Sequence, residues 1–206
     1  MADSPRILVV GTRNAKKCRE MAHALQGLPL EVRPLSDFDP VPPAVEDGET
    51  FEANAAIKAA LYARATGQWC VADDSGLEVL ALGHRPGVYS ARWGGQDGND
   101  QLNNRRLLDE LRSVPHDRRQ ARFVCVAVLA SPERSLLQAR GSCEGIILDT
   151  PRGQGGFGYD PLFYVPRLGK TMAELTADQK LAVSHRGQAL RDLRTKIEAL
   201  IRCDRP

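Results

Sequence analysis

The amino-acid sequence predicts an α/β protein in which helices flank a β-sheet. Apolar segments of strand length alternate along the chain with segments whose apolar residues recur at helical spacing. The composition, 42% hydrophobic and 26% charged, is typical of a globular protein, and 206 residues can bury a core without disulfides or metals. We therefore expect one domain over residues 1–206.

Strands and helices alternate in the first half of the chain. The expected elements are strands at 6–10, 28–35 and 69–72 and helices at 16–25 and 51–66. Gly67 follows the second helix in the position where helices commonly end. The letters D-D-S-G at 73–76 predict a turn, because aspartate is a poor strand residue and Asp, Ser and Gly favour turns.

The second half of the chain is richer in strands. The expected elements are a helix at 99–111, strands at 122–130 and 136–147, and a C-terminal helix. The last helix carries one apolar stripe, formed by Leu190, Leu193, Ile197, Leu200 and Ile201. A glycine-dense loop, G-Q-G-G-F-G-Y-D-P, lies between the last strand and this helix.

Charge and cysteine content narrow the functional classes. The formal net charge of +2 gives no indication of a protein that binds nucleic acid or a membrane surface. No segment approaches the about 18 consecutive apolar residues of a membrane span, and the first residues lack the apolar core of a signal peptide. Five dispersed cysteines without a Cys-x-x-Cys pair favour reduced thiols and a cytoplasmic protein over a zinc site or a cysteine nucleophile.

The segment G-T-R-N-A-K-K at 11–17 is the first candidate for chemistry. It lies at a predicted strand-to-helix turn, where backbone N–H groups favour anions, and Lys16 and Lys17 add positive charge. It is not a Walker A loop, because the glycine before the lysine and the Ser or Thr after it are missing. A turn with solvated lysines explains the segment equally well on its own.

Acidic residues form the second and third candidates. The letters E-D-G-E at 46–49 precede a predicted helix on which Asn54 and Lys58 share a face, and such acids commonly just complement the helix dipole. Asp73 and Asp74 repel each other unless a cation compensates them, and Mg²⁺ prefers oxygen ligands of this kind. An Asx turn at Asp74 explains that pair equally well.

The fourth candidate combines the glycine-dense loop with the letters S-H-R at 184–186. Glycines around Phe157 and Tyr159 allow a flat ligand to approach the backbone closely and to stack on a ring. His185 and Arg186, with Lys180 nearby in the sequence, are hydrogen-bond donors. Alternatively, the loop is a β-turn with core aromatics, and the basic residues form an exposed helix start.

Taken together, the four candidates predict a nucleoside triphosphate site, and they carry a family resemblance. The chain resembles the ITPase family, the Ham1-like XTP/dITP pyrophosphatases that remove deaminated purine nucleotides. The matching segments are T-R-N-A-K-K, E-D-G-x-T-F-x-x-N-A-x-x-K-A, A-D-D-S-G-L, P-G-x-Y-S-A-R, G-G-F-G-Y-D-P-x-F and S-H-R-G-Q-A. They occur in the family's order from residue 12 to residue 189, which is nearly the whole chain.

The resemblance implies a reaction, a cofactor and a fold. The expected reaction converts a nucleoside triphosphate and water into the monophosphate and pyrophosphate, with Mg²⁺, in a homodimer. The expected fold has two lobes around a long, bent, mixed sheet. The residues that match the family's binding groups are Thr12, Arg13, Asn14, Ala15, Lys16, Lys17 and Lys58 for phosphate, Glu46 and Asp74 for the metal, Ser75 for substrate, and Phe157, Gly158, Tyr159, Asp160, Lys180, His185 and Arg186 for base and sugar. Arg13 replaces a glycine that is common in the family's first motif.

These roles are chemically consistent with attack of water on the α-phosphorus. Mg²⁺ neutralises phosphate oxygens, and Lys17 and Lys58 stabilise charge that develops on the pyrophosphate. Asp74 accepts the proton of the water or holds the metal that acidifies it, while Asp73 orients the turn. A hydrogen bond from Arg186 or from backbone N–H groups to a 6-keto oxygen would reject adenine, and Phe157 would stack on any base.

Three other functions are open to the sequence. One is a Maf-like pyrophosphatase that acts on pyrimidine or modified nucleotides. The second is a regulatory module that binds nucleotides without hydrolysing them. The third is nucleic-acid binding through Arg92, Arg105, Arg106 and the basic cluster at 118–122, although the near-neutral net charge favours a solvated surface there.

Overall fold

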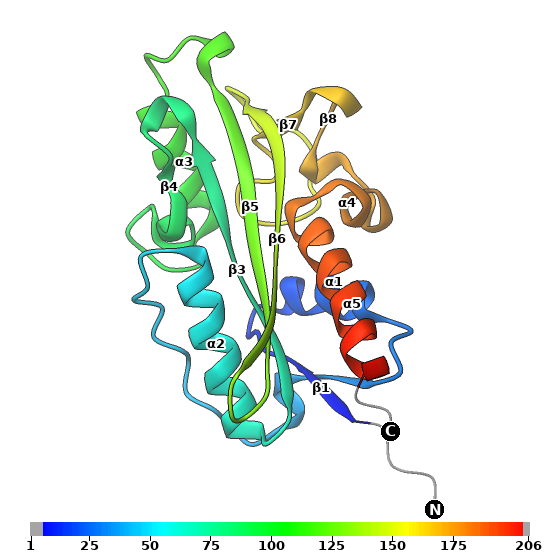
Figure 1. Cartoon of the computed structure of the whole chain (residues 1–206). Helices are drawn as coiled ribbons and strands as arrows, with labels where there is room; N and C mark the ends of the chain where they lie inside the picture. Colours follow the sequence, from blue (N-terminus) through cyan, green and yellow to red (C-terminus); the bar gives the residue numbers. More distant parts are fainter. Residues whose placement is uncertain (1–5, 204–206) are drawn as a thin grey trace, which may run out of the picture. The chain divides into compact units, whose positions relative to one another are not determined.

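One mixed β-sheet organises the chain, and the computed structural model describes its residues 6–203. Within that range, eight strands form the sheet in the order β2-β1-β3-β5-β6-β7-β8, and β4 pairs with β3 (Figure 1). Helices flank the sheet, so the predicted α/β class is confirmed. The strands are β1 (Ile7–Val10), β2 (Glu31–Pro34), β3 (Trp69–Val79), β4 (Arg85–Pro86), β5 (Gln120–Ala130), β6 (Ser135–Ile147), β7 (Phe163–Val165) and β8 (Lys170–Thr171). The α-helices are α1 (Ala15–Leu25), α2 (Phe51–Thr66), α3 (Asp100–Glu110), α4 (Ala177–Val183) and α5 (His185–Cys203).

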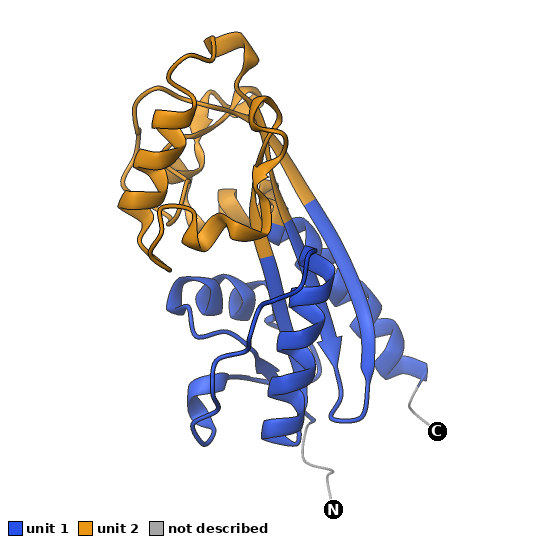
Figure 2. Cartoon of the chain, turned by 90° about the vertical axis from the view of Figure 1, so that its left-hand side faces the viewer, with its two compact units in different colours: residues 1–74, 125–141, 186–206 blue, residues 75–124, 142–185 orange. Residues whose placement is uncertain are grey.

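The chain divides into two compact units, which Figure 2 shows in different colours. Unit 1 comprises residues 1–74, 125–141 and 186–206, and unit 2 comprises residues 75–124 and 142–185. Strands β3, β5 and β6 each contribute residues to both units.

Unit 1 contains the parallel part of the sheet. Strand β1 is parallel to both β2 and β3, with Leu8 opposite Val32 in one pair and Trp69 in the other. Because parallel strands are covered on both faces, Leu8, Val9 and Val10 are fully buried. Helix α2 covers one face of these strands, and α1 and α5 cover the other (Figure 1).

Helix α2 begins and ends where the sequence predicted. The Thr50 hydroxyl oxygen accepts a hydrogen bond from the Ala53 N–H at 3.1 Å, which caps the first turn. Gly67 ends the helix in the left-handed conformation, with a φ of 65°. Ala55 and Ala59 are fully buried, so the backbone of this helix lies close to the sheet.

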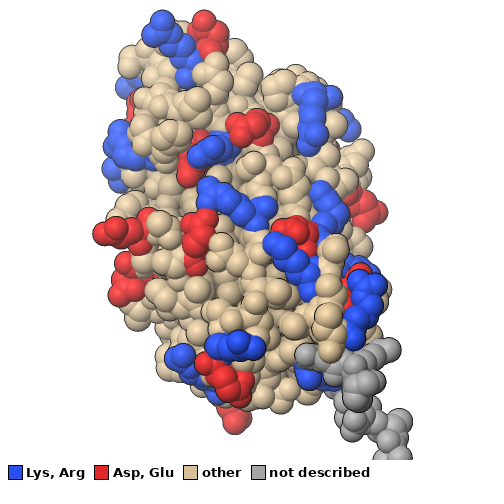
Figure 3. All heavy atoms as spheres, viewed as in Figure 1, with Lys and Arg blue, Asp and Glu red and all other residues tan. Residues whose placement is uncertain are grey.

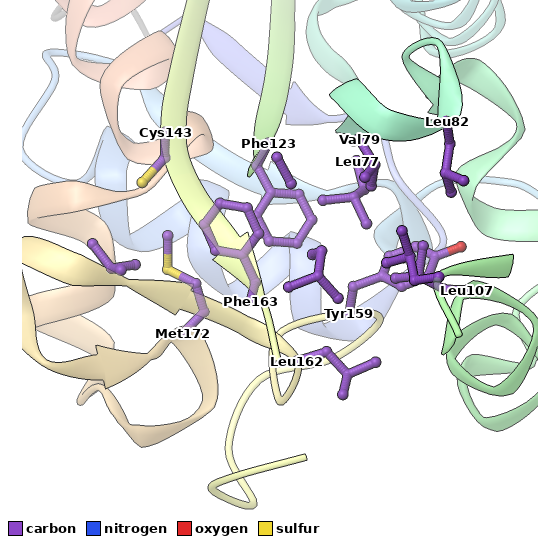
Figure 4. Close-up of a cluster of buried hydrophobic side chains, with 14 residues drawn as sticks. Leu77, Val79, Leu82, Leu107, Phe123, Cys143, Tyr159, Leu162, Phe163 and Met172 are labelled. Atoms are coloured by element: carbon purple, nitrogen blue, oxygen red, sulfur yellow. The ribbon is translucent and has the colours of Figure 1, made fainter. Parts of the chain in front are cut away.

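Unit 2 has its own hydrophobic core, shown in Figure 4. Side chains from β3, β5, β6, β7 and α3 meet there around Phe123 and Phe163, whose ring centroids are 4.4 Å apart. Gly145 is required beside them, because a Cβ at this position would lie 2.5 Å from the Phe163 ring. This core supports the loop at 153–161 through the buried side chains of Tyr159 and Leu162.

The predicted turn at 73–76 was wrong. These residues lie inside β3, which continues to Val79. Successive side chains of a strand point to opposite faces, so Asp73 and Asp74 do not point at each other. Cationic groups on both faces compensate the two carboxylates, and this allows a strand where the local sequence favours a turn.

Candidate active site

The segment Gly11–Asn14 joins β1 to α1 and exposes the start of the helix. The Asn14 side chain accepts hydrogen bonds from the N–H groups of Lys16 and Lys17 at 2.9 and 3.1 Å and so caps α1. The Asn14 N–H in turn donates to the Thr12 hydroxyl at 3.2 Å. Gly11 lets the turn approach the sheet, because a Cβ there would lie 2.5 Å from the Cys70 sulfur.

Asp73 is the buried anion on the α1 and α5 face of β3. Arg186 donates to Asp73 Oδ2 from Nε at 3.1 Å and from Nη2 at 3.0 Å, and Lys17 Nζ lies 3.4 Å from the same oxygen. Burial alone would raise the pKa of this carboxyl, but the charges of Lys17 and Arg186 outweigh burial and hold its pKa well below the ordinary value. Arg186 Nη1 also donates to Glu20 at 2.6 Å.

Asp74 lies on the opposite face of β3, against α2. Its Oδ2 accepts a hydrogen bond from Asn54 Nδ2 at 3.2 Å, and its Oδ1 lies 3.6 Å from Lys58 Nζ. Burial raises the pKa of this carboxyl, and the charges of Lys58 and Lys17 offset the increase only in part. Asp74 is therefore a stronger base than an ordinary aspartate, whereas its neighbour is a weaker one.

Glu46 and Asp74 face the same ammonium group. Lys58 Nζ lies 3.0 Å from Glu46 Oε2 as well as close to Asp74, and burial lowers the pKa of Lys58 less than the surrounding carboxylates raise it. Two carboxylates at one place fit a hard divalent cation that takes its remaining ligands from water and phosphate. Among the described residues no group of three or more His, Cys, Asp or Glu side chains could hold a metal ion.

The glycine-dense loop of unit 2 is built around Asp160. Its Oδ2 accepts hydrogen bonds from the Phe157 N–H at 2.8 Å and from Lys180 Nζ at 2.7 Å. The ammonium of Lys180 also lies 4.6 Å from the centroid of the Phe157 ring. Gly156 is essential to this arrangement, because its φ is +73° and a Cβ would lie 2.1 Å from Asp160 Oδ2.

Hydrogen bonds to other residues of unit 2 fix the same loop. The Gly158 N–H donates to Asp100 at 2.8 Å, and the Gly158 carbonyl accepts from Asn104 at 3.0 Å. The Tyr159 hydroxyl donates to the Ser90 carbonyl at 2.8 Å. The backbone between Phe157 and Asp160 is therefore fixed on both sides.

The predicted residues fall into two sets. Unit 1 contains the predicted phosphate and metal groups: Thr12, Arg13, Asn14, Ala15, Lys16, Lys17, Glu46, Lys58, Asp74 and also Arg186. Unit 2 contains Ser75, Phe157, Gly158, Tyr159, Asp160, Lys180 and His185. Arg13 reaches the Val41 carbonyl, and the His185 ring stacks on Phe123 with centroids 4.7 Å apart. Arg186 was predicted beside the base, and in the structure it binds the carboxylates of Glu20 and Asp73 in unit 1.

Sequence reasoning missed several residues that hold these groups. The sequence indicated that Asn54 shares a face of α2 with Lys58, four positions later, but it predicted no role for Asn54. Glu20, Asp100 and Asn104 carried no such indication, because their partners lie far away in the sequence. Such long-range pairs leave no periodic pattern.

Unit 1 thus has lysines at the start of a helix and a pair of buried carboxylates, residue types that suit a phosphorylated ligand and its cation. The chain belongs to the Ham1 family, whose sequence profile matches residues 8–196. No helix among the described residues is long and apolar enough to cross a membrane.

Individual relatives match over nearly their whole length. A dITP/XTP pyrophosphatase of Syntrophobacter fumaroxidans is 51% identical over 95% of this chain and 84% of its own. A dITP/XTP pyrophosphatase of Geobacter sulfurreducens is 54% identical over 89% of this chain and 92% of its own. The solved structure of a HAM1 protein from Coxiella burnetii is 40% identical, covers 94% of this chain and 99% of its own, and superposes with a TM-score of 0.85.

Proposed function

We propose that the protein hydrolyses the deaminated purine nucleoside triphosphates ITP, dITP and XTP to the monophosphate and pyrophosphate, and so keeps them out of DNA and RNA. The observation that carries the proposal is the pairing of each aspartate of β3 with its own lysine, Asp73 with Lys17 and Asp74 with Lys58. The names of the two dITP/XTP pyrophosphatase relatives support the substrate class.

Asp74 is the proposed proton acceptor for the water that attacks the α-phosphorus. A catalytic base works best when its pKa approaches the working pH, and burial raises the pKa of metal-free Asp74 in that direction. With Mg²⁺ bound to this carboxylate, Asp74 would instead act by holding the metal that acidifies the water. Asp73 keeps its charge and holds Lys17 beside the helix start that is assigned to phosphate. The adjacent aspartates therefore have different proposed roles, as base and as fixed counter-ion.

Glu46 and Asp74 are the proposed ligands of Mg²⁺. When bound, Mg²⁺ would neutralise phosphate oxygens and acidify the attacking water. Lys17 and Lys58 stabilise the charge that remains on the leaving pyrophosphate. Thr12 and Asn14 shape the turn at the start of α1, and Arg13, Ala15 and Lys16 complete the proposed phosphate-binding segment.

The base and sugar are assigned to residues of unit 2. Phe157 is the proposed stacking surface, and Lys180 is the donor already held beside its ring by Asp160. Ser75, Gly158, Tyr159 and His185 complete the proposed set. Arg186 can serve the base only if it gives up part of its contact with Glu20 or Asp73, so we assign its donor role to the bound state.

Assembly and compartment belong to the same proposal. The family resemblance supports a homodimer, which light scattering after size-exclusion chromatography would test. The five cysteines are free, which supports a reducing compartment such as the cytoplasm.

The arginine-rich segment at 118–122 does not support nucleic-acid binding. Arg119 pairs with Asp149 and Arg122 with Glu78, both at 2.5 Å, so these charges are compensated within the protein. On the face shown in Figure 3, basic and acidic side chains are interspersed. A continuous basic surface would be needed for strong phosphate-backbone binding.

The decisive experiment measures pyrophosphate release from ITP, dITP, XTP, GTP, ATP and dTTP, with Mg²⁺ and with EDTA. The proposal predicts metal-dependent release from the first three and little from the others. Preferential release from dTTP would support the Maf-like alternative instead. Binding without release from any nucleotide would leave a regulatory nucleotide-binding module.

A further inference from the structure

Asn54 is a buried polar side chain beside Asp74 that lies outside the proposed catalytic, metal-binding and substrate-binding residues. Its side chain in α2 is 1% exposed and uses both ends of its amide. Oδ1 accepts a hydrogen bond from the Gly48 N–H at 2.8 Å, and Nδ2 donates to Asp74 Oδ2 at 3.2 Å. Asn54 therefore connects the acidic segment 46–48 to the proposed catalytic carboxylate.

Lys58 forms a second connection between the same two parts. Its Nζ lies 3.0 Å from Glu46 Oε2 and 3.6 Å from Asp74 Oδ1. Asn54 and Lys58 are one helical turn apart, so α2 holds one oxygen of Asp74 with each side chain. The first connection is neutral and the second is charged.

The two connections respond differently to ligands. A divalent cation between Glu46 and Asp74 would repel the ammonium of Lys58, and a triphosphate would attract it. The neutral amide of Asn54 experiences neither effect and can keep both of its hydrogen bonds. The hydrogen bond between Gly48 and Asn54 also requires the glycine, because a Cβ on Gly48 would lie 2.7 Å from Asn54 Oδ1.

We propose that Asn54 is a positioning residue, which keeps Asp74 and the segment carrying Glu46 together while Lys58 exchanges the carboxylates for the substrate phosphates. This inference rests on the proposed function. It makes the hydrogen bond to Asp74, rather than the packing of Asn54, the feature on which turnover depends.

Asn103 provides a matched control in unit 2. It is a helical asparagine that is 2% exposed, and its Oδ1 accepts from the Gly94 N–H at 2.6 Å. Its Nδ2 donates to the Ala91 carbonyl at 2.9 Å, so it binds a glycine-containing loop as Asn54 does but contacts no proposed catalytic group. Asn103→Ala and Asn54→Ala should therefore lower stability in similar ways.

The experiment compares wild type, Asn54→Ala, Gly48→Ala and Asn103→Ala. Three quantities are measured: kcat and KM for ITP, the thermal midpoint Tm, and the rise in Tm caused by α,β-methylene-ITP with Mg²⁺ or with EDTA. The last quantity needs no turnover, because the methylene group replaces the oxygen of the bond to be cleaved. A ligand that binds only the folded state raises Tm by an amount that grows with the logarithm of its concentration relative to its Kd, so at one ligand concentration a smaller rise reports weaker binding.

For Asn54→Ala we expect kcat to fall about 10²-fold, because displacement of a reacting group by about 1 Å can cost that much. KM should change far less, and the Mg²⁺-dependent part of the Tm rise should shrink. Gly48→Ala should act in the same direction, and the double variant should lose little more than either single variant. Asn103→Ala should lower Tm but leave kcat, KM and the Mg²⁺-dependent part of the Tm rise close to wild type.

A kcat and a Mg²⁺-dependent Tm rise for Asn54→Ala that match those of Asn103→Ala would overturn the proposal. If Asn54→Ala does not fold, Gly48→Ala decides by the same criteria. Wild type that releases no pyrophosphate from ITP would contradict the proposed function, whereas the analogue measurement still tests Asn54.

Discussion

Asp73 and Asp74 are adjacent on β3, yet they contact different helices and have pKa values shifted in opposite directions. Asp73 binds Lys17 and Arg186, and their charges, acting against burial, lower its pKa. Asp74 contacts α2, and burial raises its pKa. The alternation of side chains along a strand thus separates two chemically identical residues into two environments.

Asp74→Asn should abolish most turnover without lowering stability. Loss of a general base typically costs about 10²–10⁴-fold in rate. Since folding raises the pKa of Asp74, its charged form opposes folding, and this contribution is least favourable above the folded-state pKa. We therefore expect a Tm at pH 7 to 8 equal to or above that of wild type, measured beside kcat for ITP. A loss of less than about tenfold in kcat would contradict the assignment of Asp74.

Asp73→Asn should have the opposite effect on stability. Removing one partner of a buried ion pair typically costs about 3–5 kcal/mol, because the cationic groups remain buried without their counter-ion. Folding lowers the pKa of Asp73, so its contribution is complete above the unfolded-state pKa of about 3.9 and is lost as the pH falls below it. Urea unfolding at pH 7 and near pH 3 measures both values. The difference between variant and wild type should shrink at the lower pH, and an equal difference at both would exclude this explanation.

Gly156→Ala should weaken substrate binding more than it weakens the fold. The new Cβ would lie 2.1 Å from Asp160 Oδ2, which holds both Lys180 and the Phe157 backbone. We expect KM for ITP to rise about tenfold or more, as for loss of a base-stacking contact of about 1–3 kcal/mol.

Gly98→Ala is the control for the Gly156 variant. Its φ of +69° imposes a similar backbone strain, but no atom lies within 4 Å of the new Cβ. Its Tm should fall while KM stays near wild type. An equal rise of KM above wild type in both variants would show that backbone strain, rather than the collision with Asp160, weakens substrate binding.

The thiols should differ sharply in reactivity. Cys203 is exposed and Cys18 is partly exposed, whereas burial raises the pKa of Cys70 and Cys125 far above the ordinary thiol value. At about pH 8 we expect a thiol reagent to modify Cys203 first, Cys18 more slowly, and the three buried thiols, which include Cys143, only after denaturation. Mass spectrometry of peptides from partly modified protein identifies the order. Early modification of Cys125 would mean that the surroundings of Asp73 open readily.

Local signals predicted the elements that have local causes. Helix α2 was placed from Phe51 to Thr66 because its cap, its alanine-rich body and its terminal glycine are all contiguous. The strand at 28–35 is shorter in the structure, Glu31–Pro34, because only these residues pair with β1. Strands β4, β7 and β8 and helix α4 were missed, since segments of two to seven residues are too short to show a period.

The site was predicted where motifs are contiguous and missed where partners are distant. The turn at 11–17 and the loop at 153–161 could be identified from adjacent residues. The strand through Asp73 could not, because Arg186, which stabilises it, is 113 positions away. No single-sequence pattern records such a pair, and the turn-forming letters D-S-G suggested the opposite backbone.

Unit 1 is formed by three separate segments of the chain, and a ribosome synthesises the last of them after all of unit 2. A ribosome completes Lys17, Lys58 and both aspartates of β3 long before it reaches Arg186 at the start of α5. Until then Asp73 lacks its guanidinium partner, and a chain truncated before this helix has an incomplete anion site. The buried ion pair of Asp73 is therefore completed only when α5 is synthesised, and a translation product interrupted before Arg186 lacks it.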